Sequence, residues 1–213
     1  MDLFLAGGGT TEQEAQVWAA AFAGVTNVLY WPFALADARA PAAEAWLSDG
    51  MHSLGITAAV SMWTSLAGHD APELAGYDLV FVGGGTTSKL VNHIRRYGFD
   101  TALADHIRGG GRYYGGSAGA LLPCEWITLA SMIEDDPEAA GTRGIDVFNG
   151  ASIFPHADTY PPGTAAHLAE RLGHSLYALP EASGLHVSDR TISPIGPGAI
   201  RIARPDGAIE VLG

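Results

Sequence analysis

One serine of this chain is flanked by small residues in a pattern typical of a nucleophile. The segment 115–119 reads Gly-Gly-Ser-Ala-Gly, with Ser117 at its centre. A serine on a sharp strand-to-helix turn needs such neighbours, because the surrounding backbone must approach closely without side chains. A helix that begins just after Ser117 would also point free N–H groups at an oxyanion formed there. The alternative is an ordinary glycine-rich turn with a capping serine.

A serine hydroxyl is a weak nucleophile unless a base accepts its proton, and that base is usually a histidine oriented by a carboxylate. Of the eight histidines, His156 follows the apolar run 152–155, which predicts a buried strand. Catalytic groups gather at the carboxyl ends of strands in open α/β sheets, so His156 is the candidate base. A structural histidine is the alternative. His156 and Asp158 would also offer two metal ligands, but no third ligand of matching spacing lies nearby, and no metal is expected.

A second glycine turn, Gly83–Gly85, follows the apolar run 78–82. It lacks both the Gly-Lys-Ser/Thr ending of a P-loop and the Gly-x-Gly-x-x-Gly spacing of a dinucleotide fold, so nucleotide binding is the weaker interpretation. In a serine hydrolase such a turn has another use. A backbone N–H of Gly84 or Gly85 would complete an oxyanion hole with the N–H of Ala118.

The elements that must position these residues alternate between strand and helix. Apolar runs predict strands at 3–6, 25–31, 56–62, 78–82 and 112–114, and Thr11 and Glu14 read as a capping box that opens the first helix. This alternation predicts an α/β fold with a doubly wound, mostly parallel sheet and helices on both faces. After residue 176, short apolar runs separated by Pro, Gly and Asp predict β-hairpins at the sheet edge. A length of 213 residues favours a single domain, 1–213.

Composition excludes several classes of function. The formal net charge of −12 repels phosphate backbones and anionic lipid, so neither nucleic acid nor a membrane surface is an expected partner. The apolar runs are strand-sized, the N-terminus does not resemble a secretory signal, and the single Cys124 rules out an internal disulfide. These features favour a cytoplasmic protein. Trp18, Trp46 and Trp63 are expected to pack in the core or between helices.

Four motifs together resemble the peptidase E and cyanophycinase family of serine peptidases. They are the strand and turn ending in Gly83-Gly84-Gly85-Thr86, the elbow around Ser117, Phe154-Pro155-His156, and Leu179-Pro180-Glu181 before a strand. Their order and separations fit along almost the entire chain. The resemblance implies a fold similar to class I glutamine amidotransferases, with Ser117 as nucleophile and His156 as general base. It also implies that no metal or organic cofactor takes part.

The resemblance leaves the third member of the triad open. Asp135 falls close to an aspartate of peptidase E, but the surrounding loop differs in length by one residue, so Glu134 and Asp136 stay alternatives. Glu181 is the other candidate, because it follows a strand end and matches a recurring glutamate of the family. A solvated acidic turn is the simpler interpretation of 134–136. If Asp135 orients His156, Glu181 or Asp158 would be free to bind the amine of a substrate.

Members of this family act as small exopeptidases on peptides with an N-terminal aspartate, or as depolymerases of aspartate-arginine polymer. Recognition of an aspartate side chain needs a cation, best an arginine. Aspartyl dipeptidases of the family carry basic residues after the catalytic histidine, whereas 157–170 here contains neither Lys nor Arg. Lys89, Arg143 and Arg171 are the cations that would have to reach the site from elsewhere.

The sequence therefore predicts a serine exopeptidase acting on small peptides, with dipeptides that carry an N-terminal aspartate as the first substrates to examine. An esterase or amidase with the same triad is one alternative. A non-catalytic module that binds a small ligand is the other. Edge strands of such sheets often pair, so a homodimer is an expectation for the assembly.

Overall fold

The computed structural model describes residues 1–148, 150–189 and 191–213. Its main sheet has the strand order β3-β2-β4-β5-β1-β8-β9. The parallel strands are β1 (Asp2–Ala6), β2 (Asn27–Trp31), β3 (Ala59–Met62), β4 (Leu79–Val82) and β5 (Arg112–Gly116). The strands β8 (Gly184–Ser188) and β9 (Ile192–Ile195) extend the sheet in antiparallel fashion beside β1. The predicted mostly parallel sheet is therefore confirmed.

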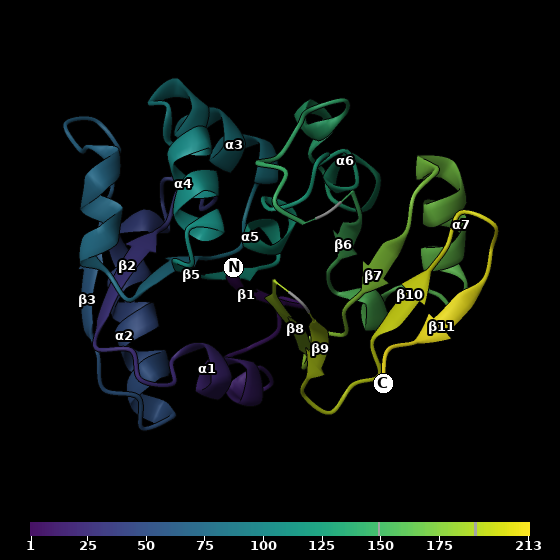
Figure 1. Cartoon of the computed structure of the whole chain (residues 1–213), viewed down its shortest axis with the longest axis horizontal. Helices are drawn as coiled ribbons and strands as arrows, with labels where there is room; N and C mark the ends of the chain where they lie inside the picture. The colour runs from purple at the N-terminus through teal and green to yellow at the C-terminus, as the bar shows by residue number, and fades with distance from the viewer. Residues whose placement is uncertain (149, 190) are drawn as a thin grey trace.

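Helices cover both faces of this sheet (Figure 1). One face packs against α1 (Ala15–Ala21) and α2 (Ala43–Ser53), and the other against α3 (Thr87–Arg96), α4 (Phe99–Arg108) and α5 (Ala118–Leu121). Alternate side chains of a strand point to opposite faces. Leu79 and Phe81 of β4 accordingly join the core beneath α1 and α2, whereas Val80 and Val82 join the core beneath α3 and α4. Burial on both faces explains why these strands are continuous apolar runs.

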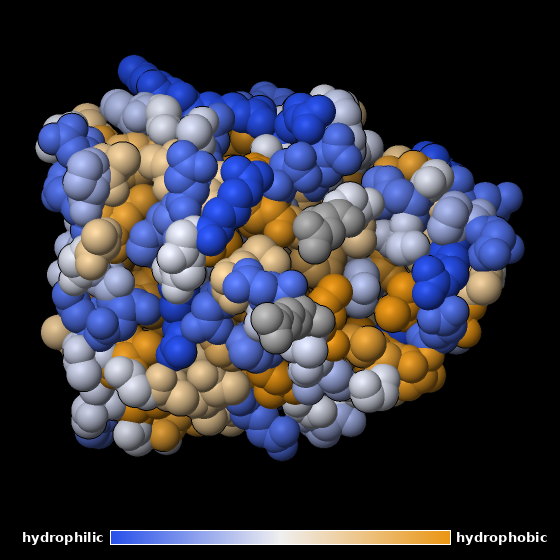
Figure 2. Space-filling view, viewed as in Figure 1, coloured by the Kyte–Doolittle hydropathy of each residue, from blue (hydrophilic) through white to orange (hydrophobic). Residues whose placement is uncertain are grey.

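A second sheet, of order β11-β10-β7-β6, lies beside the first. Its strands are β6 (Ser152–Phe154), β7 (Leu176–Ala178), β10 (Arg201–Ala203) and β11 (Ile209–Val211), with α7 (Thr164–Leu172) between β6 and β7 in the chain. The hairpin β8–β9 forms at the edge of the main sheet as expected, but β7, β10 and β11 belong to the second sheet. A hairpin pattern in the sequence does not show which of the two sheets its strands join. Figure 2 shows hydrophobic side chains gathered over β7 and β10.

The remaining helical segments are short: α6 (Ala130–Ile133), η1 (Ala40–Ala42), η2 (Ala71–Gly76), η3 (Pro137–Ala139) and η4 (Ala157–Thr159). Within the described ranges, none of the helices combines the length and the apolar character that a membrane crossing requires.

The capping pair before α1 is displaced by one residue from the predicted one. Thr10 N–H donates to Gln13 Oε1 at 2.7 Å, and Gln13 N–H donates to Thr10 Oγ1 at 3.3 Å. Glu14, predicted as a capping residue, instead turns inward and is 3% exposed. The pattern alone did not separate the two registers, because Thr10 and Thr11 are both suitable caps.

Candidate active site

Ser117 occupies a strained turn between β5 and α5. Its φ of 51° is one of three positive values for non-glycine residues in the described part of the chain, and His156 has another, 53°. Such backbone costs about 1–3 kcal/mol per residue and is concentrated at functional sites. Close approach explains Gly119, because a Cβ there would lie 2.3 Å from the carbonyl oxygen of Val82. The predicted elbow geometry is therefore present around Ser117.

His156 reaches the serine from the second sheet. It follows β6, and its backbone N–H donates to the carbonyl oxygen of Gly7 at 2.9 Å. The strand before His156 was predicted to belong to the open α/β sheet, whereas β6 lies in the smaller one. The general rule still holds locally, because β6 and β7 are parallel and both end at this site. Ser117 thus comes from one sheet and His156 from the other.

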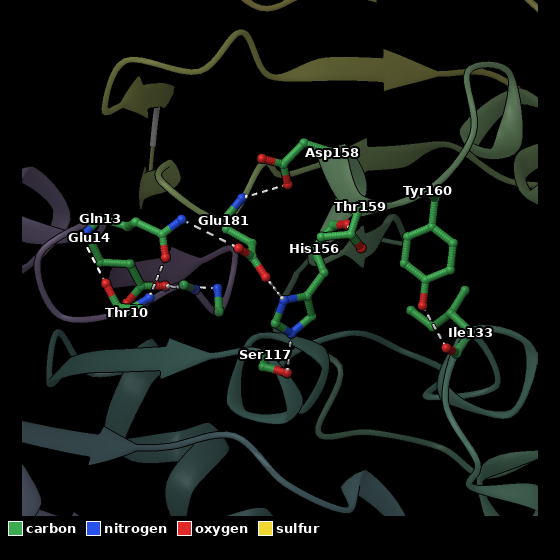
Figure 3. Close-up of polar contacts among 12 residues, drawn as sticks. Thr10, Gln13, Glu14, Ser117, Ile133, His156, Asp158, Thr159, Tyr160 and Glu181 are labelled. Atoms are coloured by element: carbon green, nitrogen blue, oxygen red, sulfur yellow. Dashed lines mark hydrogen bonds and ion pairs between the residues drawn. The ribbon is translucent and has the colours of Figure 1, made fainter.

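A chain of hydrogen bonds joins three of the predicted residues (Figure 3). Ser117 Oγ lies 2.9 Å from Nε2 of His156, and Nδ1 of the same ring lies 3.0 Å from Oε1 of Glu181. The side chains of His156 and Glu181 are 29% and 28% exposed, so the site is open to a small substrate. Serine, histidine and carboxylate in this order form the arrangement in which a histidine accepts the hydroxyl proton.

Glu181 is itself held in place. Its backbone N–H donates to Oδ1 of Asp158 at 2.9 Å, and Gln13 Nε2 lies 3.4 Å from its Oε2 (Figure 3). Since Glu181 follows β7 and His156 follows the parallel neighbour β6, their separation is set by strand spacing. The second sheet thus brings the carboxylate and the imidazole together.

The acidic run 134–136 does not supply the carboxylate next to the imidazole. Asp135 is exposed, and no hydrogen bond or ion pair is found for its side chain in the described structure. Asp136 is buried, accepting hydrogen bonds from N–H and Oγ of Ser88 at the start of α3. The structure therefore brings Glu181, and not Asp135, to His156. A helix-capping role explains Asp136, and sequence spacing could not reveal it.

Glu134 differs from its two neighbours because it is partly buried near the imidazole. Burial raises the pKa of its carboxyl from 4.5 to about 7, while the positive charge available to His156 and the Thr87 hydroxyl oppose this shift. Thr87 Oγ1 lies 3.4 Å from Oε2 of Glu134. The side chain of Glu134 therefore has one long hydrogen bond, and its carboxyl group has a pKa of about 7.

Backbone amides beside Ser117 are free to bind an oxyanion. The N–H groups of Gly84, Gly85 and Ala118 have no hydrogen-bond acceptor among the described residues. A Cβ placed on Gly84 would lie 3.1 Å from Cβ and 3.5 Å from Oγ of Ser117, so the turn passes directly beside the hydroxyl. Gly84 is thus the glycine of this turn that lies next to Ser117, and Ala118 follows Ser117 in the chain, so an oxyanion hole at these amides stays a prediction.

A buried carboxylate network supports the first glycine turn, and the sequence analysis missed it. Glu14 Oε1 accepts the N–H groups of Gly8 and Gly9 at 2.7 and 3.1 Å, and Oε2 accepts Trp18 Nε1 at 3.1 Å and the hydroxyl of Tyr114. Burial raises the pKa of Glu14, and these donors oppose that shift. A glutamate directly before an apolar helix was the available signal, but it resembled an ordinary capping residue.

The chain is similar to known peptidases over most of its length. The model of peptidase family S51 matches residues 3–195. Peptidase E of Salmonella gallinarum is 32% identical over 131 residues, covering 56% of this chain and 55% of that protein. Peptidase E of Salmonella typhimurium is 30% identical over 132 residues, covering 61% and 56% respectively. The matched stretch thus spans about half the length of these curated relatives.

Solved structures share the fold. A peptidase from an acI-B1 actinobacterium superposes with a TM-score of 0.73 at 18% identity, covering 100% of this chain and 94% of that one. A protein from Listeria monocytogenes EGD-e gives a TM-score of 0.68 at 18% identity, covering 92% of this chain and 98% of that one. At such identities the likeness shows the fold alone.

Proposed function

This chain belongs to peptidase family S51, and from that premise we propose that it is a serine exopeptidase that hydrolyses small peptides through an acyl-enzyme on Ser117. The observation that carries the proposal is the hydrogen-bonded chain from Ser117 through His156 to Glu181. A fold of this kind serves many functions, so the function is inferred from the geometry of the site and not from the sheet.

In the proposed reaction, Ser117 Oγ attacks the carbonyl carbon of the scissile amide while Nε2 of His156 takes the hydroxyl proton. Glu181 accepts the hydrogen bond from Nδ1–H, which fixes the tautomer and stabilises the imidazolium that forms. The N–H groups of Ala118 and of Gly84 or Gly85 stabilise the oxyanion. His156 then protonates the leaving amine, the C–N bond breaks, and water releases the acyl group by the same proton transfers.

An exopeptidase also needs a partner for the free amine of its substrate. Glu181 is engaged with His156, and Asp158 accepts the backbone N–H of Glu181, so both candidate carboxylates already have structural roles. Glu134 lies near the imidazole and has only the 3.4 Å contact from the Thr87 hydroxyl as a side-chain hydrogen bond among the described residues. We infer that Glu134 binds the substrate amine.

Dipeptides with an N-terminal aspartate are the substrates that the resemblance to peptidase E favours. Two of the three candidate cations are already engaged elsewhere. Lys89 Nζ lies 2.6 Å from both the carbonyl oxygen of Leu35 and Oδ1 of Asp37, and Arg143 pairs with Glu125 at 3.3 Å. Of the cations named from the sequence, Lys89 and Arg143 therefore have other partners than a substrate carboxylate.

The test compares wild type with Ser117→Ala, Glu181→Gln and Asp135→Asn on dipeptides with free and acetylated N-termini. Loss of the nucleophile should remove detectable hydrolysis, and Glu181→Gln should lower kcat by roughly 10²–10⁴-fold, as for other residues that orient a catalytic histidine. Asp135→Asn, the matched control, should stay within about twofold of wild type, as expected of an exposed site. Acetylated peptides should be poor substrates.

Three results would contradict the proposal. Unchanged hydrolysis in Ser117→Ala would exclude this serine as the nucleophile. A large loss in Asp135→Asn with none in Glu181→Gln would reverse the assignment of the acid. Ser117-dependent hydrolysis of p-nitrophenyl esters without any peptide cleavage would favour the esterase alternative.

A further inference from the structure

A cavity of about 520 Å³ opens beside Ser117 on the side of the main sheet that carries α1 and α2. Its volume falls in the range of sites that bind small molecules. Five aromatic side chains from α1, α2, β2, β4 and β5 line it: Trp18, Tyr30, Trp46, Phe81 and Tyr114. This cavity contains neither His156 nor Glu181 in its wall, so the hydrogen-bonded triad does not account for its aromatic lining.

The aromatic rings that line the cavity pack against one another, and one of them, Trp46, is partly exposed. Trp46 packs edge-on against Trp18, with ring centroids 5.9 Å apart, and tilted against Tyr30 and Phe81, each at 6.4 Å. Trp46 remains 48% exposed, whereas the other rings of the wall are almost fully buried. An exposed tryptophan anchored by three buried rings is a preformed surface on which a further apolar side chain becomes buried.

The charges around the cavity disfavour an acidic occupant. Its wall includes two charged side chains, Glu14 and Arg39. Glu14 is buried and would repel a carboxylate, and its own oxygens are occupied by four donors. Arg39 is exposed and so differs from the desolvated arginine that selective binding of an aspartate side chain requires.

The position of the cavity relates it to one residue of the substrate. Ser117, Gly84 and Gly85 line the same cavity. A substrate whose carbonyl carbon lies next to Ser117 Oγ therefore lies at the edge of this cavity, within reach of the side chain of the residue that supplies the carbonyl. We propose that this cavity selects substrates in which the residue that supplies the scissile carbonyl is aromatic or large and apolar, in preference to aspartate. This inference rests on the proposed peptidase function.

The first experiment measures kcat/KM of the whole protein for a matched series of dipeptides: Phe-Ala, Trp-Ala, Leu-Ala, Ala-Ala and Asp-Ala. Aromatic first residues should exceed Ala-Ala and Asp-Ala by about tenfold or more, the size of effect expected for filling an apolar pocket. Ser117-dependent cleavage in which Asp-Ala or Ala-Ala equals or exceeds Phe-Ala would overturn the proposal while leaving the peptidase function intact.

A pair of variants then tests the cavity itself. Ala42 is exposed and lines the cavity, so Ala42→Trp should fill it without disturbing the core. We expect a loss of about tenfold or more in kcat/KM for Phe-Ala and little change for Ala-Ala. Ala45 is equally exposed in α2 and lies outside the cavity wall, so Ala45→Trp is the matched control and should leave both substrates unaffected. Equal losses for both substrates in Ala42→Trp would overturn the proposal.

Peptide binding to the Ser117→Ala variant measures the selectivity of the cavity independently of catalysis. Calorimetric titration with Phe-Ala, Ala-Ala and Asp-Ala should show about tenfold or tighter binding of Phe-Ala. If no peptide is cleaved by wild type but Phe-Ala still binds most tightly, the peptidase function fails and the selectivity of the cavity stands. Binding of Asp-Ala or Ala-Ala as tight as that of Phe-Ala would overturn the selectivity directly.

Discussion

The two glycine turns after β1 and β4 share the letters Gly-Gly-Gly-Thr but differ in what their amides bind. In the first turn, Gly8 and Gly9 donate to Glu14, and the carbonyl oxygen of Gly7 receives the N–H of His156. In the second, the N–H groups of Gly84 and Gly85 have no acceptor in the described structure, and Gly84 lies beside Ser117. One turn is thus a scaffold for the histidine, whereas in the proposed reaction the other presents donors to the substrate. The same glycine sequence can therefore serve different roles, depending on which groups its backbone amides contact.

The two turns also differ in how a neighbouring carboxyl group is held. Glu14 beneath the first turn accepts hydrogen bonds from four donors. Glu134 contacts Thr87, just after the second turn, through a single hydrogen bond of 3.4 Å. A buried carboxylate with a full set of donors rigidifies its surroundings, whereas a weakly held one responds to pH and to ligands. Each of the following substitutions tests one side of this contrast.

The largest effect is expected from crowding the second turn. Gly84→Ala would place a methyl group 3.1 Å from Cβ of Ser117, next to the proposed oxyanion hole. Because φ of Gly84 is not positive, the backbone accepts alanine, and the loss should fall on kcat, by roughly 10²-fold or more, with little change in melting temperature. Steady-state kinetics and thermal unfolding measure the two quantities.

Gly76→Ala is the control, because a Cβ there meets no atom within 4 Å. Wild-type kcat in Gly84→Ala would remove the second turn from the catalytic site. A collapse of stability in the same variant would instead make it a scaffold like the first.

Glu14→Gln tests the first turn. With its NH₂ group toward the first turn, glutamine would leave the N–H groups of Gly8 and Gly9 without an acceptor. Turned the other way, it would leave the hydroxyl hydrogen of Tyr114 without one, while Trp18 Nε1 would still donate to the Tyr114 oxygen. Such unpaired groups cost about 1–3 kcal/mol, so the free energy of unfolding should fall by about 2 kcal/mol. Urea denaturation measures the change, with the exposed Glu170→Gln as the control. Stability at or above that of wild type would show that the carboxyl is not the acceptor around which the turn is built.

Glu134→Gln should have the smallest effect on stability, and that effect should depend on pH. Burial raises the pKa of this carboxyl from 4.5 to about 7 in the folded state, so its contribution to stability is complete below pH 4.5 and is lost as the pH rises through 7. Glutamine stays neutral throughout. The variant should therefore match wild type near pH 4.5 and exceed it above pH 7, by about 1–2 kcal/mol after allowance for solvent screening.

Chemical denaturation between pH 4.5 and pH 8 measures this difference, and the exposed Glu138→Gln should show none. A Glu134→Gln variant that follows wild type across the whole range would place the titration of Glu134 outside neutrality. It would also remove the contrast between the two carboxyl groups.

Local chemistry explains which features could be predicted from the sequence. Glycines around Ser117 require a sharp turn wherever the strand lies, so the elbow was predictable from five residues. The continuous apolar run at 79–82 indicated a strand buried on both faces, which favours a mostly parallel sheet. His156, which lies 2.9 Å from Ser117 Oγ, was identifiable from its place at a strand end.

The tertiary structure alone decided which carboxylate meets His156 and what surrounds Ser117. Asp135 lies 21 positions before His156 and Glu181 lies 25 after it, so sequence distance favoured neither, and the parallel pairing of β6 with β7 selected Glu181. Glu14 and Trp46 looked like ordinary helix residues until packing directed one inward and left the other in the cavity wall. The physical reason is that hydrogen-bond partners and cavities depend on distances across sheets, which a linear pattern does not contain.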